Sequence, residues 1–427
     1  MKQTHSVIVA GAGLAGLTAG LRLQKEGKDV LIIEQNQKAG GLCRSSYIDG
    51  YEFATACNDF GSGFGKILQM LEVPVKFLPA RQVFCVGNLL LNPASARGLF
   101  RLLPYAPDLL RAIYSIRKNR YANLEELIDH NLKSSGFKDL IAVLSYALAM
   151  APGDVLLQAL RENFSNRYNY GYEKAIVPVG GPGAITEAMV KTFTDRGGKI
   201  IYNTRVLKTE RNGRQKEVYT TDGTWQADNV ISSVPRWHLY PENCKQLLHI
   251  NMLYVALSKR LVFPKEINTF TIMPAGVKNW LGTLDQGILP EAFGFHIVRS
   301  LLSEKEDYYT VNIYFMGPRG YTHFDEGTQQ HMIEYIFGSI EERIPGFGNA
   351  VLYKKFVSPD TFRSLYGISS QHSRYVLPEG FEKPPVYDPE EDIYYIGNSV
   401  YPPGEHVGGA VVSAWLATSM ILERDKV

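Results

Sequence analysis

The chain has 427 residues and a formal net charge of +2, so its composition gives no case for nucleic-acid binding. Its length favours two interleaved domains. The cysteines Cys43, Cys57, Cys85 and Cys244 lack metal-site spacing, so we expect no metal and reduced thiols in a cytoplasmic protein. No uninterrupted apolar run reaches about 18 residues, so we expect no spanning helix. The N-terminal strand leaves no room for a signal peptide, and we expect none.

A glycine motif follows the first predicted strand, residues 6–10, which read Ser-Val-Ile-Val-Ala. Gly11, Gly13 and Gly16 form a G-x-G-x-x-G at the start of an apolar helix. Gly11 permits the tight turn, Gly13 lets a pyrophosphate approach the backbone, and Gly16 lets the helix press on the strand. The free N–H groups of the helix N-terminus favour a negative ligand. The motif therefore predicts a dinucleotide site.

The residues after the second predicted strand, 29–33, indicate which dinucleotide binds. Glu34 ends that strand and can accept hydrogen bonds from a ribose hydroxyl. The glycine pair Gly40-Gly41 and then Arg44 follow. This pattern resembles the FAD-dependent superfamily that contains amine oxidases, protoporphyrinogen oxidase, UDP-galactopyranose mutase and the phytoene desaturases. The resemblance implies that the glycine pair passes close to the flavin and that Arg44 lies near its phosphates or ring.

Two later segments resemble the same superfamily. A strand and glycine-rich turn at residues 174–188 contain Gly180-Gly181, and Val206 matches a residue that contacts adenine through its backbone. Near the C-terminus, a strand at 392–396 leads to a final helix whose first residues are small. Backbone donors there are expected to reach flavin O2 and N1. The FAD contacts that the resemblance implies are Gly11, Gly13, Leu14, Ala15, Gly16, Glu34, Gln35, Gly40, Gly41, Leu42, Arg44, Gly180, Gly181, Val206, Gly397, Asn398, Gly408, Gly409 and Ala410.

The fold class implied is α/β. We expect a Rossmann-type, glutathione-reductase-like FAD-binding domain at residues 1–80, 174–235 and 385–427. An interleaved substrate domain of mixed sheet and helices is expected at residues 81–173 and 236–384.

Residues 93–120 are the most unusual part of the predicted surface. Six Lys and Arg residues stand here against one acid, Asp108, among many large apolar residues. One interpretation is a helix pair packed on the domain with solvated arginines. The other is a membrane-facing part that attaches the protein peripherally to the inner face of a membrane.

The chemistry implied is hydride transfer from a C–C or C–N bond to flavin N5. Glu405 and His406 precede the final helix and are the candidate catalytic residues. We expect His406 to be an acid/base because an unperturbed histidine titrates near neutrality. The helical insertion, a Ser-Pro-Asp segment at 358–360 and the lack of an obvious aromatic cage favour a phytoene-desaturase-like enzyme on a lipophilic isoprenoid or polyene. The alternatives are a flavin amine oxidase on a small amine, a redox-neutral flavin isomerase and a non-enzymatic, escort-like prenyl-lipid binder.

Overall fold

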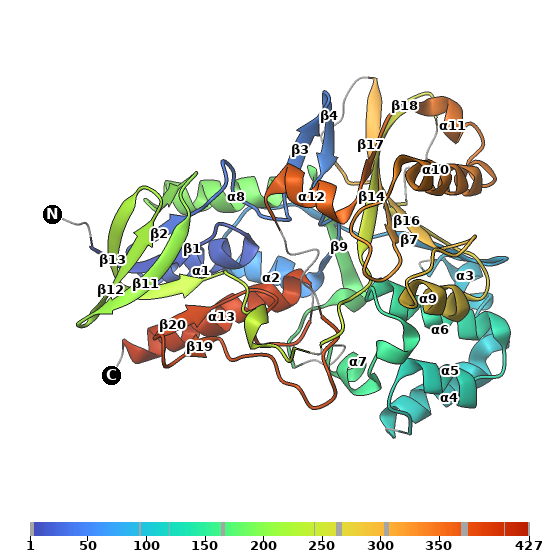
Figure 1. The fold of residues 1–427 in the computed structure, drawn as a ribbon, viewed down its shortest axis with the longest axis horizontal. Helices are drawn as coiled ribbons and strands as arrows, with labels where there is room; N and C mark the ends of the chain where they lie inside the picture. Colours follow the sequence, from blue (N-terminus) through green and yellow to red (C-terminus); the bar gives the residue numbers. More distant parts are fainter. Residues whose placement is uncertain are drawn as a thin grey trace.

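The computed structural model describes residues 4–93, 95–118, 120–163, 167–242, 244–261, 267–302, 307–368, 375–404 and 406–425. Two sheets lie side by side, with helices on their faces (Figure 1). The first sheet has the order β10-β2-β1-β13-β12-β11, and β20 pairs with β13. Its strands are β1 (Thr4–Ala10), β2 (Val30–Ile33), β10 (Lys199–Ile201), β11 (Val206–Asn212), β12 (Gln215–Thr220), β13 (Gly223–Ser232), β19 (Tyr387–Asp388) and β20 (Ile393–Tyr395).

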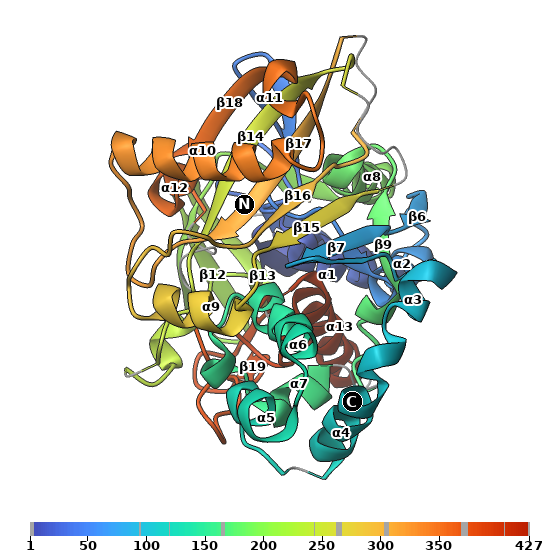
Figure 2. The same ribbon diagram turned by 90° about the vertical axis from the view of Figure 1, so that its right-hand side faces the viewer.

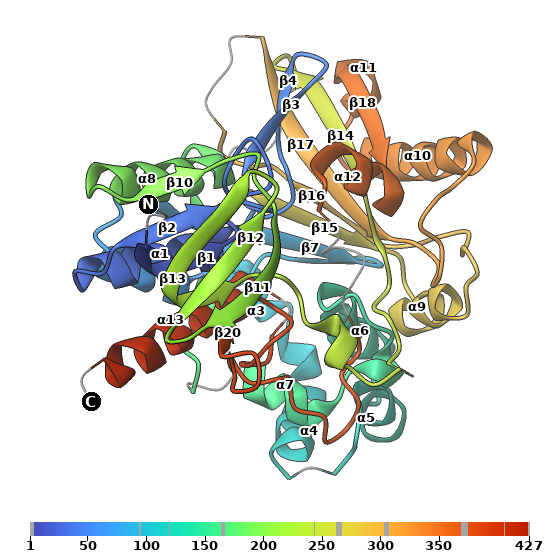
Figure 3. The same ribbon diagram turned by 60° about the vertical axis from the view of Figure 1, so that its left-hand side comes forward.

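The first sheet is parallel around β1, which pairs with β2 on one side and β13 on the other. Figure 3 brings this sheet and its antiparallel extension β11–β12 to the front. Such a parallel sheet needs cover on both faces, which is why β2 and the second half of β1, residues 7–10, are fully apolar. One covering layer consists of α1 (Leu14–Lys25), α8 (Gly181–Asp195) and α13 (Val407–Arg424). Gly20 lets α1 approach closely, because a Cβ there would lie 2.9 Å from Cδ1 of Ile32.

The second sheet has the order β18-β14-β17-β16-β15-β7-β8. It is antiparallel except that β7 pairs in parallel with β15, so a segment near residue 84 joins strands that come much later in the chain. Its strands are β7 (Gln82–Val86), β8 (Leu89–Leu91), β14 (Ile250–Ser258), β15 (Thr269–Met273), β16 (Phe295–Val298), β17 (Tyr308–Met316) and β18 (Val351–Val357).

Helices cover the second sheet. Figure 2 shows α4, α5, α6 and α7 gathered below β15 and β7. One apolar core runs through this helical layer, the sheet and α10, and it includes Tyr146, Phe315 and Ile336. The helices are α3 (Ala96–Phe100), α4 (Ala106–Arg117), α5 (Leu124–Asn131), α6 (Ser135–Ala147), α7 (Leu157–Asn163), α9 (Val277–Asp285), α10 (Glu326–Glu341), α11 (Phe347–Ala350) and α12 (Pro359–Tyr366), with short 3₁₀ turns η1 (Leu103–Tyr105), η2 (Pro152–Asp154) and η4 (Trp237–Leu239).

Smaller elements connect the two sheets. They are the hairpin of β3 (Ser45–Ile48) and β4 (Tyr51–Ala54), helix α2 (Ser62–Met70), the short strands β5 (Phe60–Gly61), β6 (Phe77–Pro79) and β9 (Ala175–Pro178), and the turn η3 (Tyr172–Lys174). The predicted α/β fold class is confirmed, whereas the domain boundaries stay a prediction. None of the described helices is long and apolar enough to cross a membrane.

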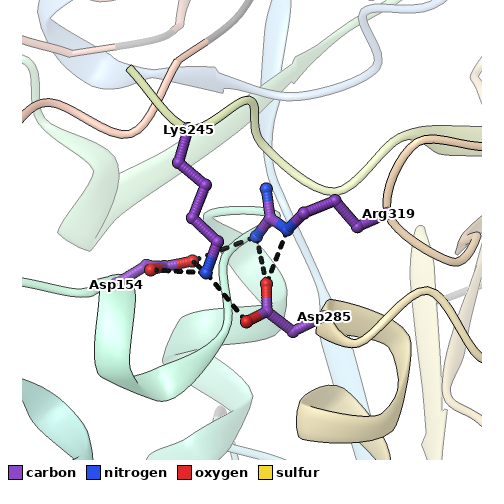
Figure 4. Close-up of polar contacts among 4 residues, drawn as sticks. All are labelled: Asp154, Lys245, Asp285 and Arg319. Carbon is purple, nitrogen blue, oxygen red and sulfur yellow. Dashed lines mark hydrogen bonds and ion pairs between the residues drawn. The ribbon is translucent and has the colours of Figure 1, made fainter. Parts of the chain in front are cut away.

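A four-residue ion-pair network fastens the helical layer to the second sheet (Figure 4). Lys245 Nζ lies 2.9 Å from Oδ2 of Asp154, in η2, and 2.8 Å from Oδ2 of Asp285, at the end of α9. The Arg319 guanidinium, just after β17, contacts the same two carboxylates. Burial is the largest single influence on the pKa of Asp285 and would raise it. The hydrogen bonds and charges of Lys245 and Arg319 together outweigh burial and lower this pKa. The network therefore joins four segments that are far apart in the chain.

Candidate cofactor and substrate site

The N-terminus of α1 is open in the way that a phosphate site requires. Gly13 is the N-cap, with no side-chain hydrogen bond, and a Cβ on Gly13 would meet nothing within 4 Å. The first helical bond runs from Leu17 N–H to Gly13 O, so the N–H groups of Leu14, Ala15 and Gly16 have no partner within the helix. These unpaired N–H donors favour a negatively charged ligand at the helix N-terminus.

The other two glycines of the motif are required by close packing. Gly11 has φ +104°, and a Cβ there would lie 2.0 Å from Oγ of Ser233. A Cβ on Gly16 would lie 1.9 Å from the carbonyl oxygen of Gly11. Any side chain at either position would therefore push α1 away from the sheet.

The second glycine pair meets the first motif directly. Gly40 N–H donates to Ala12 O at 2.8 Å, and Gly40 has φ +109°. A Cβ on Gly41 would lie 3.6 Å from Cα of Gly13. Together, Gly11–Gly16 and Gly40–Gly41 form what we call the glycine cradle. Leu42 follows it and accepts a hydrogen bond from Cys57 N–H at 3.4 Å.

Arg44 lies just beyond the glycine cradle as a cation with no described acid partner. Its Nε is buried with no hydrogen-bond partner among the described residues. Its guanidinium lies 5.6 Å from the ring centre of Tyr366. A buried guanidinium is costly unless an anion pairs with it. Arg44 and the open helix end together fit the pyrophosphate of a dinucleotide.

Glu34 is buried beside the glycine cradle. Its Oε2 accepts from Ala12 N–H at 2.7 Å, and its Oε1 accepts from Asn36 N–H at 2.9 Å and from Asn36 Nδ2 at 3.0 Å. Oε2 accepts only one of these bonds and can accept another, so the site still fits a ribose hydroxyl. The exposed Gln35 lines a surface groove of about 530 Å³ together with Arg44 and Tyr366. Val206 begins β11 next to this corner, because Thr204 N–H bonds to Glu34 O.

The glycine pair Gly180-Gly181 stands at the start of α8, which packs against α1. Gly180 and Gly181 have φ +88° and +75°, and Gly180 is the N-cap of α8. The first turn of α8 lies against the chain just after the glycine cradle, where Thr186 Oγ1 donates to Cys43 O. The pair itself lies against another segment, because Gly180 N–H donates to Leu301 O at 2.7 Å.

The C-terminal segment brings a second helix N-terminus to the site. Gly397 N–H donates to Ser413 Oγ at 2.8 Å. Asn398 O accepts from Lys383 Nζ at 2.6 Å, while Asn398 Oδ1 is buried with no partner among the described residues. Gly408, Gly409 and Ala410 form the first turn of α13.

His406 is the N-cap of α13. Its Nδ1 accepts from Gly409 N–H at 3.2 Å, and the rings of Tyr170 and Tyr172 each pack edge-on against it at 4.6 Å. Burial, helped by the charge of Lys383, lowers the pKa of His406 to about 4. The expectation that His406 titrates near neutrality is therefore wrong, and its catalytic role stays a prediction. Glu405 lies outside the described residues.

Sequence reasoning missed a group of side chains between the two sheets. Tyr172 lies against Gly61, two residues after Asp59, and Tyr314 from β17 accepts a hydrogen bond from Asn58, the residue before Asp59. The alternating tyrosines at 168, 170 and 172 were the available signal, because residues two apart would share one face if the segment were extended. The segment of residues 59–63 resembles one that lies beside the flavin in the same superfamily, but that resemblance gave Asp59 itself no role. Among the described residues, no three His, Cys, Asp or Glu side chains form a metal-binding group.

Comparisons with known proteins bear on this geometry. Residues 9–72 match the model of an NAD(P)-binding Rossmann-like domain, and residues 86–264 match the flavin containing amine oxidoreductase model. A lycopene-forming phytoene desaturase of Pantoea ananas is 24% identical over 323 residues, 64% of this chain and 63% of that protein. A neurosporene-forming phytoene desaturase of Rhodobacter capsulatus is 21% identical, over 98% of this chain and 94% of that protein.

The chain is thus similar to the FAD-dependent amine oxidases and phytoene desaturases, as the sequence predicted. Cyclohexylamine oxidase from Brevibacterium oxydans has the same fold, with a TM-score of 0.69, 13% identity and coverage of 99% of this chain and 100% of that one. The predictions of FAD and of an FAD-dependent oxidoreductase are confirmed. The glycine cradle, Glu34 and Arg44 fit this cofactor, whereas the role of each single residue stays a prediction.

Proposed function

We propose that this oxidoreductase desaturates a lipophilic isoprenoid or polyene substrate. The observation that carries the proposal is a lipid-compatible surface beside the helical layer, described below. The relationship to two phytoene desaturases, one along nearly the whole chain, supports the same substrate class. Bound FAD would supply the hydride acceptor.

The chain's own residues would hold the cofactor by complementary charge. The N–H groups of Leu14, Ala15 and Gly16 would bind the pyrophosphate, with Arg44 neutralising it. Glu34 would orient a ribose hydroxyl. The N-terminus of α13, which His406 caps, would place the positive end of the helix dipole beside the flavin and favour its negatively charged reduced form.

A large apolar surface lies on α3, η1 and α4. We call the following six exposed side chains the apolar patch: Phe100, Leu103, Leu109, Leu110, Ile113 and Tyr114, which are 40% to 68% exposed. Isolated exposed apolar residues are normal in proteins, but a contiguous group of this kind marks an interaction site.

The charge around the apolar patch is positive. Arg101, Arg117, Lys118 and Arg120 are exposed, whereas the acid of this region, Asp108, is buried. Asp108 accepts hydrogen bonds from Arg111 at 2.6 Å and from Ser134 N–H at 2.8 Å. Its negative charge is therefore paired inside the protein and does not offset the exposed cations. Apolar side chains rimmed by cations suit the headgroup region of an anionic membrane. The proposal therefore includes peripheral attachment at the inner face of a membrane, from which a lipophilic substrate could enter.

A small amine is the second candidate substrate, supported by the amine oxidoreductase model that matches residues 86–264. The two candidates are separated by mixing FAD-loaded protein anaerobically with phytoene in vesicles or with cyclohexylamine. Bleaching of the flavin by phytoene supports the proposal. Bleaching by the amine alone replaces it.

A further inference from the structure

Residues 54–59 form a segment held between the loop that contains Arg44 and the second sheet. Side chains from β14 and β17 bond three consecutive carbonyl oxygens of this segment. Asn312 Nδ2 donates to Ala54 O at 2.7 Å, Tyr254 OH to Thr55 O at 2.8 Å, and Tyr314 OH to Ala56 O at 2.9 Å. On the other edge, Thr55 N–H donates to Arg44 O at 2.8 Å. Because backbone groups on both edges of the segment are hydrogen-bonded, the positions of the residues that follow are well fixed.

Asp59 ends this segment with a carboxylate that no described cation neutralises. Gln82 Nε2 donates to its Oδ2 at 3.3 Å. No Lys or Arg pairs with it among the described residues, and burial raises its pKa. The side chain nevertheless keeps part of its surface accessible. An acid in such surroundings gains and loses its proton closer to neutral pH than an exposed one.

The groups around Asp59 connect it to the start of α13, where we expect the flavin ring. Tyr172, from η3, lies against Gly61, two residues after Asp59, since a Cβ on Gly61 would lie 3.2 Å from Cδ2 of Tyr172, and its ring also packs on His406, the N-cap of α13. Tyr314, from β17, accepts a hydrogen bond at 2.5 Å from Nδ2 of Asn58, the residue before Asp59. The segment that carries Asp59 is thus bounded by the loop that contains Arg44, by the start of α13 and by the second sheet.

We propose that Asp59 faces the space shared by the flavin ring and the substrate, and that it accepts the proton released during desaturation. This proposal rests on the proposed function. Of two hydrogens on adjacent carbons, one leaves with its electron pair as hydride to oxidised FAD. The other leaves as a proton to the Asp59 carboxylate, which becomes a carboxylic acid. The electron pair of that second C–H bond becomes the new C=C bond.

The neighbouring side chains are poorly suited to accept this proton. Burial raises the pKa values of Tyr172 and Tyr314, so both stay protonated near neutrality. His406 uses Nδ1 to cap α13, and its lowered pKa makes it a weak base. Among these described side chains, Asp59 is the base whose pKa has moved toward the working range.

The test uses the bound flavin as a charge sensor, independently of turnover. The midpoint potential of FAD-loaded protein is measured between pH 5 and 9 in the wild type and in Asp59→Asn. A nearby carboxylate opposes addition of negative charge to the flavin. The variant should therefore have the more positive potential at high pH, and the difference should vanish as pH falls through the pKa of Asp59. Asp59→Glu, which keeps the charge, should behave like the wild type.

Matched variants make the result specific to this carboxylate. Asp195→Asn removes an exposed acid at the end of α8 and should leave the potential unchanged. Gln82→Leu removes the donor to Asp59 and should move the transition to higher pH. Reduction of the flavin by phytoene should slow about 100-fold or more in Asp59→Asn, the scale of general-base catalysis.

Equal potentials in the wild type and Asp59→Asn across this pH range, with FAD bound to both, would overturn the assignment of Asp59. That result would leave the proposed substrate class intact. Failure of phytoene to reduce the wild-type flavin would instead contradict the proposed function, and the potentials would still show whether Asp59 faces the ring.

Discussion

His406 Nδ1 accepts a hydrogen bond from the backbone N–H of Gly409 at 3.2 Å, so a histidine begins the C-terminal helix α13. A capping side chain satisfies an N–H that the helix itself cannot. We predict that His406→Ala destabilises the protein by about 1 kcal/mol and lowers the FAD content. His406→Asn should preserve both, because asparagine caps well. Denaturant unfolding and the flavin-to-protein absorbance ratio measure these effects.

The lowered pKa of His406 gives the same prediction a pH dependence. Its folded pKa of about 4 lies below the unfolded value of 6.5, so between these values the unfolded chain binds the extra proton. His406 therefore costs stability as pH falls from 6.5 toward 4, by up to about 3 kcal/mol. The loss of stability as pH falls from 6.5 toward 4 should be smaller in His406→Asn than in the wild type. An identical pH curve in the two proteins would show that this imidazole is not buried neutral.

A substitution at Gly40 tests whether the glycine cradle needs its close backbone packing to bind FAD. A Cβ at this position would lie 2.6 Å from Cys43 O, and φ is +109°. We predict that Gly40→Ala lowers FAD occupancy at least tenfold, because the loop must move away from Gly13. Gly338→Ala is the control, since Gly338 lies in α10 with nothing within 4 Å of a Cβ. That variant should keep FAD and gain about 0.5–1 kcal/mol of stability. Full FAD occupancy in Gly40→Ala would contradict the described geometry.

Arg319 tests the network of Figure 4. Arg319→Met removes one of the two cations that face Asp154 and Asp285, whose side chains are largely buried. We predict a loss of about 2–3 kcal/mol in the free energy of unfolding, below the range for a fully buried pair because Lys245 remains. Lys191→Met, which breaks an exposed pair on α8, should change stability by less than about 1 kcal/mol. Equal effects of the two substitutions would mean that the network does not hold the layers together.

The apolar patch predicts membrane binding that depends on both hydrophobicity and charge. Leu110→Glu should weaken co-sedimentation with anionic vesicles at any ionic strength. Arg117→Glu with Lys118→Glu should weaken it mainly at low salt, because each cation near such a surface contributes about 1 kcal/mol. Leu352→Glu is the control, since Leu352 is exposed on β18, away from the patch. Unchanged binding in both patch variants would exclude this surface as the contact.

Much of the fold could be predicted because its signals are local. Residues 253–257 have aromatic and β-branched content that is typical of strands, and they lie inside β14. Residues 293–298 have similar content, and β16 covers the last four of them, from Phe295. The parallel pairing of β7 with β15 was not foreseen, since nothing near residue 84 encodes a partner almost two hundred residues away.

The candidate site also has a part that the sequence predicts and a part that it does not. The glycine cradle was predictable because each turn needs glycine at a definite position. The environment of His406 was not, because the tyrosines that bury it come from residues 170 and 172. The isolation of the Asp59 carboxylate likewise depends on segments that meet only in the folded chain.

The most direct test of the account is anaerobic reduction of the bound flavin. FAD-loaded wild-type protein is mixed with anionic vesicles containing phytoene, and the visible flavin absorption is followed; vesicles without phytoene and cyclohexylamine serve as controls. The account predicts bleaching with phytoene, a new conjugated product in the vesicles and no bleaching in either control. Bleaching by cyclohexylamine, with the flavin left oxidised by phytoene, would contradict it.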